Sequence, residues 1–280
     1  MPDVQRINKL SLSVMYFLMV IFTFLAIYPI FWLIIQSFKT TQEYMLTSKL
    51  SFPREWFFSN YPIAWRNANL GVLILNSIFY TSITVSSVIA LSFLAGFAFA
   101  KIPSKFTPVL HGSFIVGILL TLQSIMVPLF LVINTVGLLN TRLGVLIPYI
   151  GIGLPIAIYL STAYIKGIPN EILESARIDG AKYLIIFFKI IMPMAAPVAA
   201  TVAILSTTGT WNEFMLINIL VSRSNLRTLP VGIAMFAGTF STNYGQQFSA
   251  MVIGMSPMII FYFIFRKQIT KGVTAGAIKG

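Results

Sequence analysis

The stretch GIPNEILESARIDGAKYLIIFFKIIMP, residues 167–193, is unusually polar at its centre for the chain that contains it. Within six residues it places Glu174, Ser175, Arg177 and Asp179, whereas the whole chain is 57% hydrophobic and only 9% charged. Such a polar, helix-forming segment in so apolar a chain indicates a short element that lies in water between apolar elements.

Local signals divide this stretch into a short helix, a turn and a second, amphipathic helix. Asn170, after Pro169, is a good residue to begin the first helix. Glu174 and Arg177 lie three residues apart, so they could pair on one face of it. Gly180 suits a left-handed C-cap, which would turn the chain sharply. Composition leaves two interpretations open: a solvated loop held by local pairs, or a helix that docks on a soluble partner.

The rest of the chain has the composition of a membrane protein. Its 280 residues include 24 Phe, the mean hydropathy is +0.87, and apolar runs long enough to cross a bilayer recur along it. Backbone polar groups in lipid must be satisfied within the span, so we expect an all-α fold. The six expected spans are approximately 10–38, 71–100, 109–133, 143–164, 193–220 and 247–265.

The distribution of basic residues predicts the orientation of these spans. An even number of spans places both termini on one side, and if that side is the cytoplasm, twelve of the 19 Lys and Arg residues face inward. The loop 166–192 and the tail 266–280 are then cytoplasmic. The first span lacks a small-residue cleavage signal, so it is predicted to be an uncleaved anchor.

Composition excludes several classes of function. Lys and Arg occur in short groups rather than in one basic stripe, so the net charge of +12 does not predict nucleic-acid binding. The chain has no Cys and one His, His111, which argues against thiolate or His-rich metal sites and against a Ser/His triad. It also lacks a G-x-x-x-x-G-K-[ST] phosphate loop. The sequence therefore predicts no catalytic residue, no metal site and no cofactor of its own.

The order of residues in the polar stretch resembles the EAA motif of the permease subunits of bacterial ATP-binding-cassette (ABC) importers. That motif reads E-A-A, two residues, D-G-A, and later I-x-L-P. Here Ser175 stands in place of the second-position Ala, and Met192 replaces the Leu before Pro193. Three further stretches resemble the carbohydrate, maltose-type branch with six spans: VPLFLVINTVGLLNTRLGVLIPY (127–149), TWNEFMLINIL (210–220) and KGVTAGAIKG (271–280).

The resemblance implies a single type I importer transmembrane domain over residues 1–280, in a bacterial cytoplasmic membrane. It implies as partners a second homologous permease subunit, two cytoplasmic ATPase subunits that bind ATP, an extracytoplasmic solute-binding protein and a sugar. The polar stretch would be the coupling helix that contacts an ATPase through Glu174, Ser175, Ala176, Arg177, Asp179, Gly180 and Ala181. The tail residues Thr274, Ala275, Gly276 and Lys279 would reach the interface between the two ATPases.

Two alternatives remain beside a sugar importer. The chain could be an importer permease for a solute other than a sugar. A less favoured alternative is an ion-coupled secondary transporter, which would usually carry inverted repeats and several ionisable residues inside the membrane. The sequence has no clear repeat, and Glu213 is the only acidic residue inside a predicted span.

Candidates for the pore or its gate lie within the predicted spans. A charge at the centre of a span costs about 2.5–3.5 kcal/mol on insertion scales, and Glu213 lies nearer the outer end, where the cost is smaller. Its carboxylate could gate the pore, bind substrate or join a neighbouring helix. Hydroxyls at helical spacing in the second span could form a wet pore face or simply allow close packing. The candidates are Glu213, Asn212, Trp211, Ser77, Thr81, Thr84 and Gln123.

Overall fold

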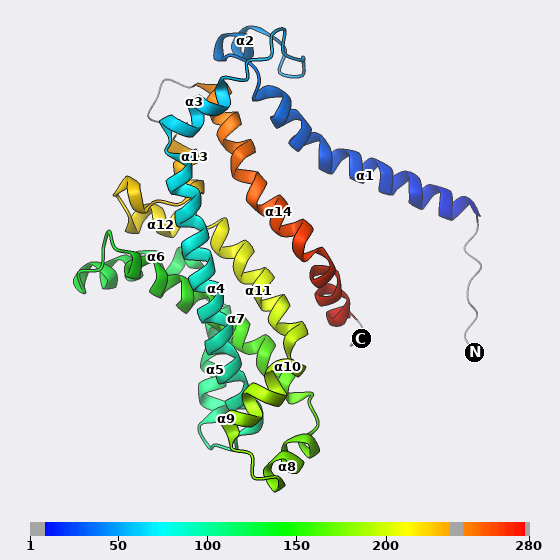
Figure 1. The fold of residues 1–280 in the computed structure, drawn as a ribbon, viewed down its shortest axis with the longest axis vertical. Helices are drawn as coiled ribbons and strands as arrows, with labels where there is room; N and C mark the ends of the chain where they lie inside the picture. The colour runs from blue at the N-terminus through cyan, green and yellow to red at the C-terminus, as the bar shows by residue number, and fades with distance from the viewer. Residues whose placement is uncertain (1–8, 236–242, 278–280) are drawn as a thin grey trace. The chain divides into compact units, whose positions relative to one another are not determined.

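The computed structural model describes residues 9–235 and 243–277, with side chains described over 12–234 and 243–267. Within these residues the secondary structure is entirely helical (Figure 1), which confirms the predicted all-α fold class. The α-helices are α1 Lys9–Gln36, α2 Thr41–Leu46, α3 Asn60–Asn67, α4 Leu70–Lys101, α5 Thr107–Ile118, α6 Leu122–Thr135, α7 Arg142–Lys166, α8 Asn170–Ile178, α9 Tyr183–Ile186, α10 Met192–Met194, α11 Ala196–Trp211, α12 Met215–Leu220, α13 Leu229–Met235 and α14 Tyr244–Ala277.

Long apolar helices dominate this list. Four are long and apolar enough to cross a membrane alone: Leu12–Gln36, Leu70–Lys101, Arg142–Lys166 and Tyr244–Lys267. Two helix pairs meet the same test together but are sharply bent, α5 with α6 by 108° and the Tyr183–Met194 segment with α11 by 75°. If each bent pair is one span, the described chain holds up to six spans, the number expected from the sequence.

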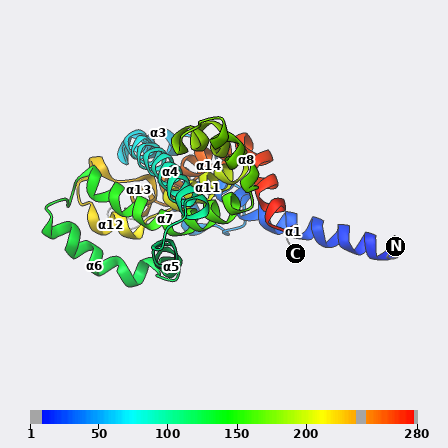
Figure 2. The ribbon, with the colours of Figure 1, turned by 90° about the horizontal axis from the view of Figure 1, so that it is seen from below.

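Three predicted segments differ from the helices observed. The span expected over 109–133 consists of α5 and α6, and Figures 1 and 2 show α6 leaving the direction of α5. The span expected over 193–220 is interrupted after Trp211, where α11 ends, and continues as α12. The tail expected from residue 266 is partly helical, because α14 continues to Ala277.

The described chain forms two compact units. The first contains residues up to Leu70 together with Ile233–Ser256, and the second contains Gly71–Gly232 together with the chain from Pro257 onward. In the first unit, the Nδ2 atom of Asn60 donates to the backbone carbonyls of Ser37 (2.8 Å) and Lys39 (2.9 Å). These bonds hold the segment after α1 against the start of α3.

One cation of the first unit is fully buried. The ammonium of Lys39 donates to the carbonyl of Ser48 (3.2 Å) and to the hydroxyl of Ser51 (3.0 Å). Burial disfavours the charged form and lowers the pKa of Lys39 from its ordinary value. The segment 38–69 between α1 and α4 is therefore a folded element with its own polar core.

In the second unit, small residues bring α4 and α7 into close contact. The hydroxyl of Ser161 donates to the carbonyl of Ser92 at 2.7 Å. A Cβ atom placed on Gly96 would lie 2.5 Å from the Oγ atom of Ser161, and one on Gly153 would lie 2.9 Å from a methyl group of Val88. Glycine at these two positions therefore permits the short distance between the helices, as is common in membrane proteins.

A buried apolar cluster joins α8 to three of the long helices. Leu173 of α8 packs in one cluster with Phe97 of α4, Ile165 of α7 and Val202 of α11. The short polar helix is thus not a loosely attached loop, because its inner face is part of the core that holds α4, α7 and α11 together.

Candidate functional site

The helix α8 has one apolar face and one polar face. Leu173 and Ala176 are only 7% and 9% exposed, because they pack in the core of the second unit. Glu174, Ser175 and Arg177 are exposed on the other side. Ala176, one of the partner contacts predicted from the sequence, lies on the buried face of α8. The exposed face is chemically suited to a protein partner in water.

The C-terminus of α8 is closed by a left-handed turn. Gly180 has φ of +81°, as the sequence predicted. The N–H of Ala181 donates to the carbonyl of Ala176 (2.9 Å), and the N–H of Gly180 donates to that of Arg177 (3.0 Å). These two bonds are the pair that defines a Schellman motif, and Ala181 packs against the apolar cluster that contains Ala176. The exposed Asp179 and Gly180 therefore occupy a fixed turn at the tip of the site.

Sequence reasoning missed Ile178, which lies at this same tip. Its side chain is 86% exposed. The apolar stripe of α8 is formed by Ile172, Leu173 and Ala176, and Ile178 lies off that stripe, as helical spacing could have shown. An exposed isoleucine beside a rigid turn adds an apolar contact to the otherwise polar face of α8.

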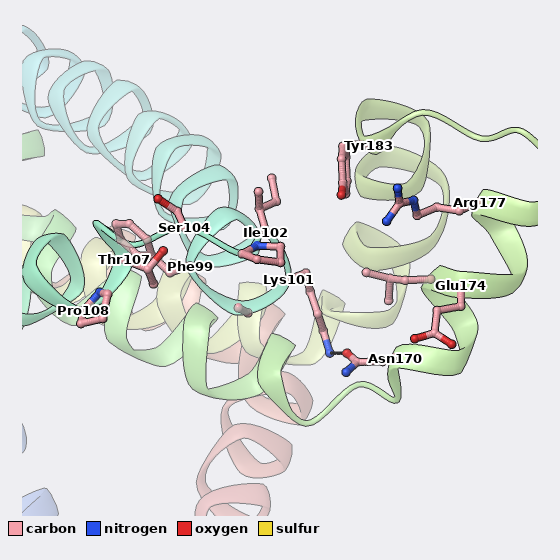
Figure 3. A pocket seen from close by; sticks show the side chains of 13 residues that line it. Phe99, Lys101, Ile102, Ser104, Thr107, Pro108, Asn170, Glu174, Arg177 and Tyr183 are labelled. Atoms are coloured by element: carbon pink, nitrogen blue, oxygen red, sulfur yellow. Dashed lines mark hydrogen bonds between the residues drawn. The ribbon is translucent and has the colours of Figure 1, made fainter.

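A groove of about 560 Å³ lies between α8 and the segment that follows α4 (Figure 3). Glu174, Arg177 and Tyr183 line one part of it, and Phe99 and Ser104 line another. The guanidinium of Arg177 lies over the ring of Tyr183, 5.3 Å from its centroid. The ion pair that Glu174 and Arg177 could form is absent from this described region, and the guanidinium contacts the aromatic ring of the neighbouring helix.

Lys101, at the end of α4, fastens that helix to the beginning of α8. Its Nζ atom donates to the Oδ1 atom of Asn170 (2.7 Å), drawn as a dashed line in Figure 3, and to the carbonyl of Ile168 (2.5 Å). A cation in the last turn of α4 also complements the negative end of that helix. No local pattern of residues predicts this contact, because its members lie more than sixty residues apart.

Glu213 lies between two helices and not within one. Its carboxylate accepts hydrogen bonds from the backbone N–H groups of Leu216 (2.7 Å) and Ile217 (3.2 Å), at the start of α12. It also accepts the hydroxyl of Tyr149 on α7 (2.6 Å). Of the roles considered from the sequence, this geometry favours the structural partner of a neighbouring helix. Tyr149 was not among the sequence candidates.

The other pore candidates occupy different environments. The hydroxyl of Ser77 accepts the N–H of Leu229 (2.9 Å), and Asn212 donates to the carbonyl of Thr208 in its own helix (3.0 Å). Gln123 is exposed. The remaining four candidates line two cavities: Thr81 and Trp211 line one, and Thr84 and Glu213 line the other.

Thr81 and Trp211 line one cavity, of about 520 Å³. Thr84 and Glu213 line the other, of about 280 Å³. These residues of the second predicted span therefore do not line one common cavity: Ser77 accepts a hydrogen bond from the first residue of α13, and Thr81 and Thr84 line different cavities.

The predicted tail contacts cannot be placed as side chains. Thr274, Ala275 and Gly276 fall within α14, beyond the residues whose side chains are described, and Lys279 lies outside the described residues. Over the part of the chain that the structure describes, no group of three or more His, Cys, Asp or Glu side chains could hold a metal ion.

Comparison with known proteins gives one family and several relatives. A model of the family described as "Binding-protein-dependent transport system inner membrane component" matches residues 91–275. The diacetylchitobiose uptake system permease protein NgcG of Streptomyces coelicolor is 31% identical over 264 residues, 94% of this chain and 87% of the relative. The trehalose transport system permease protein SugB of Mycobacterium tuberculosis is 32% identical over 257 residues, 91% and 93% of the two chains.

Solved structures include one that is similar over nearly the whole chain. It is a chain from the crystal structure of a bacterial ABC transporter involved in the import of the acidic polysaccharide alginate. The TM-score is 0.82 at 25% sequence identity, and the match covers 95% of this chain and 99% of that one. The likeness therefore includes the arrangement of the helices.

Proposed function

We propose a mechanism from the premise that this chain belongs to the family of binding-protein-dependent transport system inner membrane components and is the permease subunit of an ABC-type sugar importer. As a member of that family it is a multi-pass membrane protein that works with a solute-binding protein and an ATPase. We infer that it supplies half of the translocation pathway. ATP binding and hydrolysis then belong to the partner ATPase subunits, and this chain transmits their movement.

The observation that carries this mechanism is the double role of α8. Its exposed face ends in Ile178 and the rigid turn at Gly180, which suit a cleft on a soluble ATPase. On its inner face, Leu173 belongs to the buried cluster that also contains residues of α4, α7 and α11. A force applied to the exposed face is therefore passed through this cluster to the three long helices, because a close-packed core resists deformation.

The complete importer requires further partners. We propose a second, homologous permease that completes the pathway, and two ATPase subunits, one for each permease. We propose that both termini lie in the cytoplasm, the side from which an ATPase would reach α8. Residues Thr274, Ala275, Gly276 and Lys279 then extend toward the ATPase pair, which agrees with the continuation of α14 to Ala277.

Reconstitution of the complex tests this function. The chain would be co-expressed with the second permease, the ATPase and the binding protein encoded beside it, and uptake of radiolabelled di- and oligosaccharides into liposomes would be followed with and without ATP. We expect sugar uptake that requires both ATP and the binding protein. Uptake driven by an ion gradient without ATP would contradict the mechanism, and ATP-driven uptake of another solute alone would contradict the sugar assignment.

In the same assay, a chain lacking residues 272–280 should insert into the membrane but lose import by about fivefold or more, the effect of losing about 1 kcal/mol of interface contacts. Co-purification of the ATPase should fall in parallel. Removal of residues 278–280 alone serves as a milder matched truncation. If the longer truncation assembles and imports at the full rate, the tail has no role in ATPase docking.

Lys101 should act as a positioning residue that links α8 to α4. Lys101→Met keeps the length of the side chain but removes both hydrogen bonds to the start of α8. Because hydrogen bonds of a charged group contribute about 1.5–3 kcal/mol, we expect import per ATP hydrolysed to fall about tenfold, with the complex still assembled. Lys101→Arg retains the charge and should retain most of the coupling. The ratio of import to ATP hydrolysis distinguishes this role from a loss of folding, which would lower both together.

A further inference from the structure

The segment 45–58 of the first unit begins within α2, which lies beside the end of α1 (Figure 1). It exposes several large apolar side chains within a few residues of one another. The exposed fractions are 77% for Leu46, 71% for Leu50 and 62% for Phe52. A single exposed apolar side chain is ordinary on a soluble protein, but several in one short segment indicate a surface that something other than water covers.

The polar groups of this segment gather on its inner side, around the buried ammonium of Lys39. The Nζ atom donates to the carbonyl of Ser48 (3.2 Å) and to the hydroxyl of Ser51 (3.0 Å). That hydroxyl in turn donates to the Ser48 carbonyl (2.8 Å). Leu46 and Leu50, which flank Ser48 in the chain, are the side chains left exposed. A cation and its acceptors inside with leucines outside is the reverse of the arrangement in a loop that faces water.

Two contacts fix this segment against a helix long enough to cross the membrane. The Nε1 atom of Trp32 donates to the carbonyl of Lys49 at 2.7 Å. The ring of Phe52 meets the ring of Phe31 edge to face, with 6.5 Å between the centroids. Both partners belong to the last turns of the span Leu12–Gln36. The exposed apolar side chains therefore lie at the level where that span leaves the hydrocarbon, the layer in which membrane proteins concentrate aromatic residues.

Charged side chains border the apolar ones. The ammonium of Lys49 lies over the ring of Tyr44, 3.8 Å from its centroid, and also donates to the Tyr44 carbonyl. Lys49 is exposed, as are Arg54, two residues after Phe52, and Glu55. Long cationic side chains beside apolar ones suit the membrane interface, because the stem lies in the apolar layer and the charge reaches the headgroups. The core of a protein interface is instead depleted of charged residues, so this composition favours lipid as the covering partner.

From these contacts we propose that residues 45–58 form an interfacial anchor, in which Leu46, Leu50 and Phe52 enter the phospholipid layer. Lys49 and Arg54 lie at the level of the lipid phosphates. The insertion is shallow, because a loop within the hydrocarbon would leave backbone polar groups without partners. The anchor holds the end of α1 at a fixed depth in the bilayer, and it does not depend on which solute the chain carries.

Spin labels at single positions test the anchor, and they are practical because the chain has no Cys. Leu50→Cys and Leu46→Cys place a label on the apolar surface, and both positions are exposed enough to accept one. Glu55→Cys is the matched control, since Glu55 is exposed in the same segment but is charged. Each labelled chain would be assembled with partner subunits whose cysteines are replaced by serine, in vesicles of phosphatidylethanolamine and phosphatidylglycerol.

Power saturation in electron paramagnetic resonance would then compare two collision rates. Oxygen concentrates in lipid, whereas the nickel complex of ethylenediaminediacetate stays in water. We expect the labels at Leu50 and Leu46 to favour oxygen several-fold over the label at Glu55, at a depth of about 5–10 Å below the headgroups, as for other interfacial elements. The label at Glu55 should collide mainly with the nickel complex.

Two contrary results would refute the anchor. If the labels at Leu50 and Leu46 collide mainly with the nickel complex, the surface lies in water. If they are shielded from both reagents, another protein subunit covers the surface instead of lipid. Either result leaves the proposed function standing, because neither concerns the solute or the ATPase. A complex that imports no sugar would contradict the proposed function without moving these labels, so the two proposals fail separately.

Discussion

Gly180→Val should abolish most sugar import while the protein remains in the membrane. Gly180 has φ of +81°, a conformation that costs an ordinary L-residue about 1–2 kcal/mol and that a β-branched residue rarely adopts. Valine would therefore open the turn after α8 and displace Asp179 and Ile178 from the exposed tip. We expect import to fall about tenfold or more, with ATP hydrolysis continuing but no longer linked to uptake.

The control variant, Gly180→Asn, distinguishes a conformational penalty at this turn from the loss of a contact. A Cβ atom on Gly180 would meet no atom within 4 Å of this chain, so the penalty is conformational and not steric. Asparagine tolerates the left-handed region better than other residues that carry a side chain. Gly180→Asn should therefore keep most of the import that Gly180→Val loses. Equal losses in the two variants would show that a partner surface needs the absence of a side chain, and normal import by the valine variant would exclude the turn from coupling.

Glu213→Ala should destabilise the membrane domain more than any other single change considered for this chain. It removes the acceptor of three hydrogen bonds, from the Tyr149 hydroxyl and from the N–H groups of Leu216 and Ile217. All three donor residues are at most 5% exposed. Each buried group left unsatisfied costs about 1–3 kcal/mol, so we expect a loss of about 3 kcal/mol or more in the free energy of unfolding. Thermal unfolding of the purified protein would measure it.

Two milder variants, Glu213→Gln and Tyr149→Phe, should lower the melting temperature by less than Glu213→Ala does. Glu213→Gln keeps one acceptor oxygen and replaces the other by a donor, so its melting temperature should lie between those of the alanine variant and the unaltered protein. Tyr149→Phe removes a single donor and leaves the bonds to α12, so it should be the mildest of the three. An alanine variant that melts at the unaltered temperature would show that Glu213 is not a structural anchor.

Local chemistry explains why much of the fold could be predicted from sequence. Apolar runs such as 71–100 predict helices because a backbone in lipid has to satisfy its polar groups within the span. Gly180 predicts the turn after α8 because only glycine adopts positive φ without a penalty. The EAA-like order of residues likewise lies within one stretch, so the type of transporter could be identified before the structure was known.

Contacts between distant residues were decided only by the tertiary structure. Glu213 looks from the sequence like a charge within a span, but the fold brings Tyr149 to it from 64 positions away and ends α11 before it. Lys101 looks like an ordinary inward-facing cation, and its role as a tie to Asn170 depends on the packing of α4 near α8. Helical propensity and turn chemistry act over a few neighbouring residues and can be read along the chain. Which buried donor meets which acceptor depends on how the helices pack, and no local pattern of residues determines it.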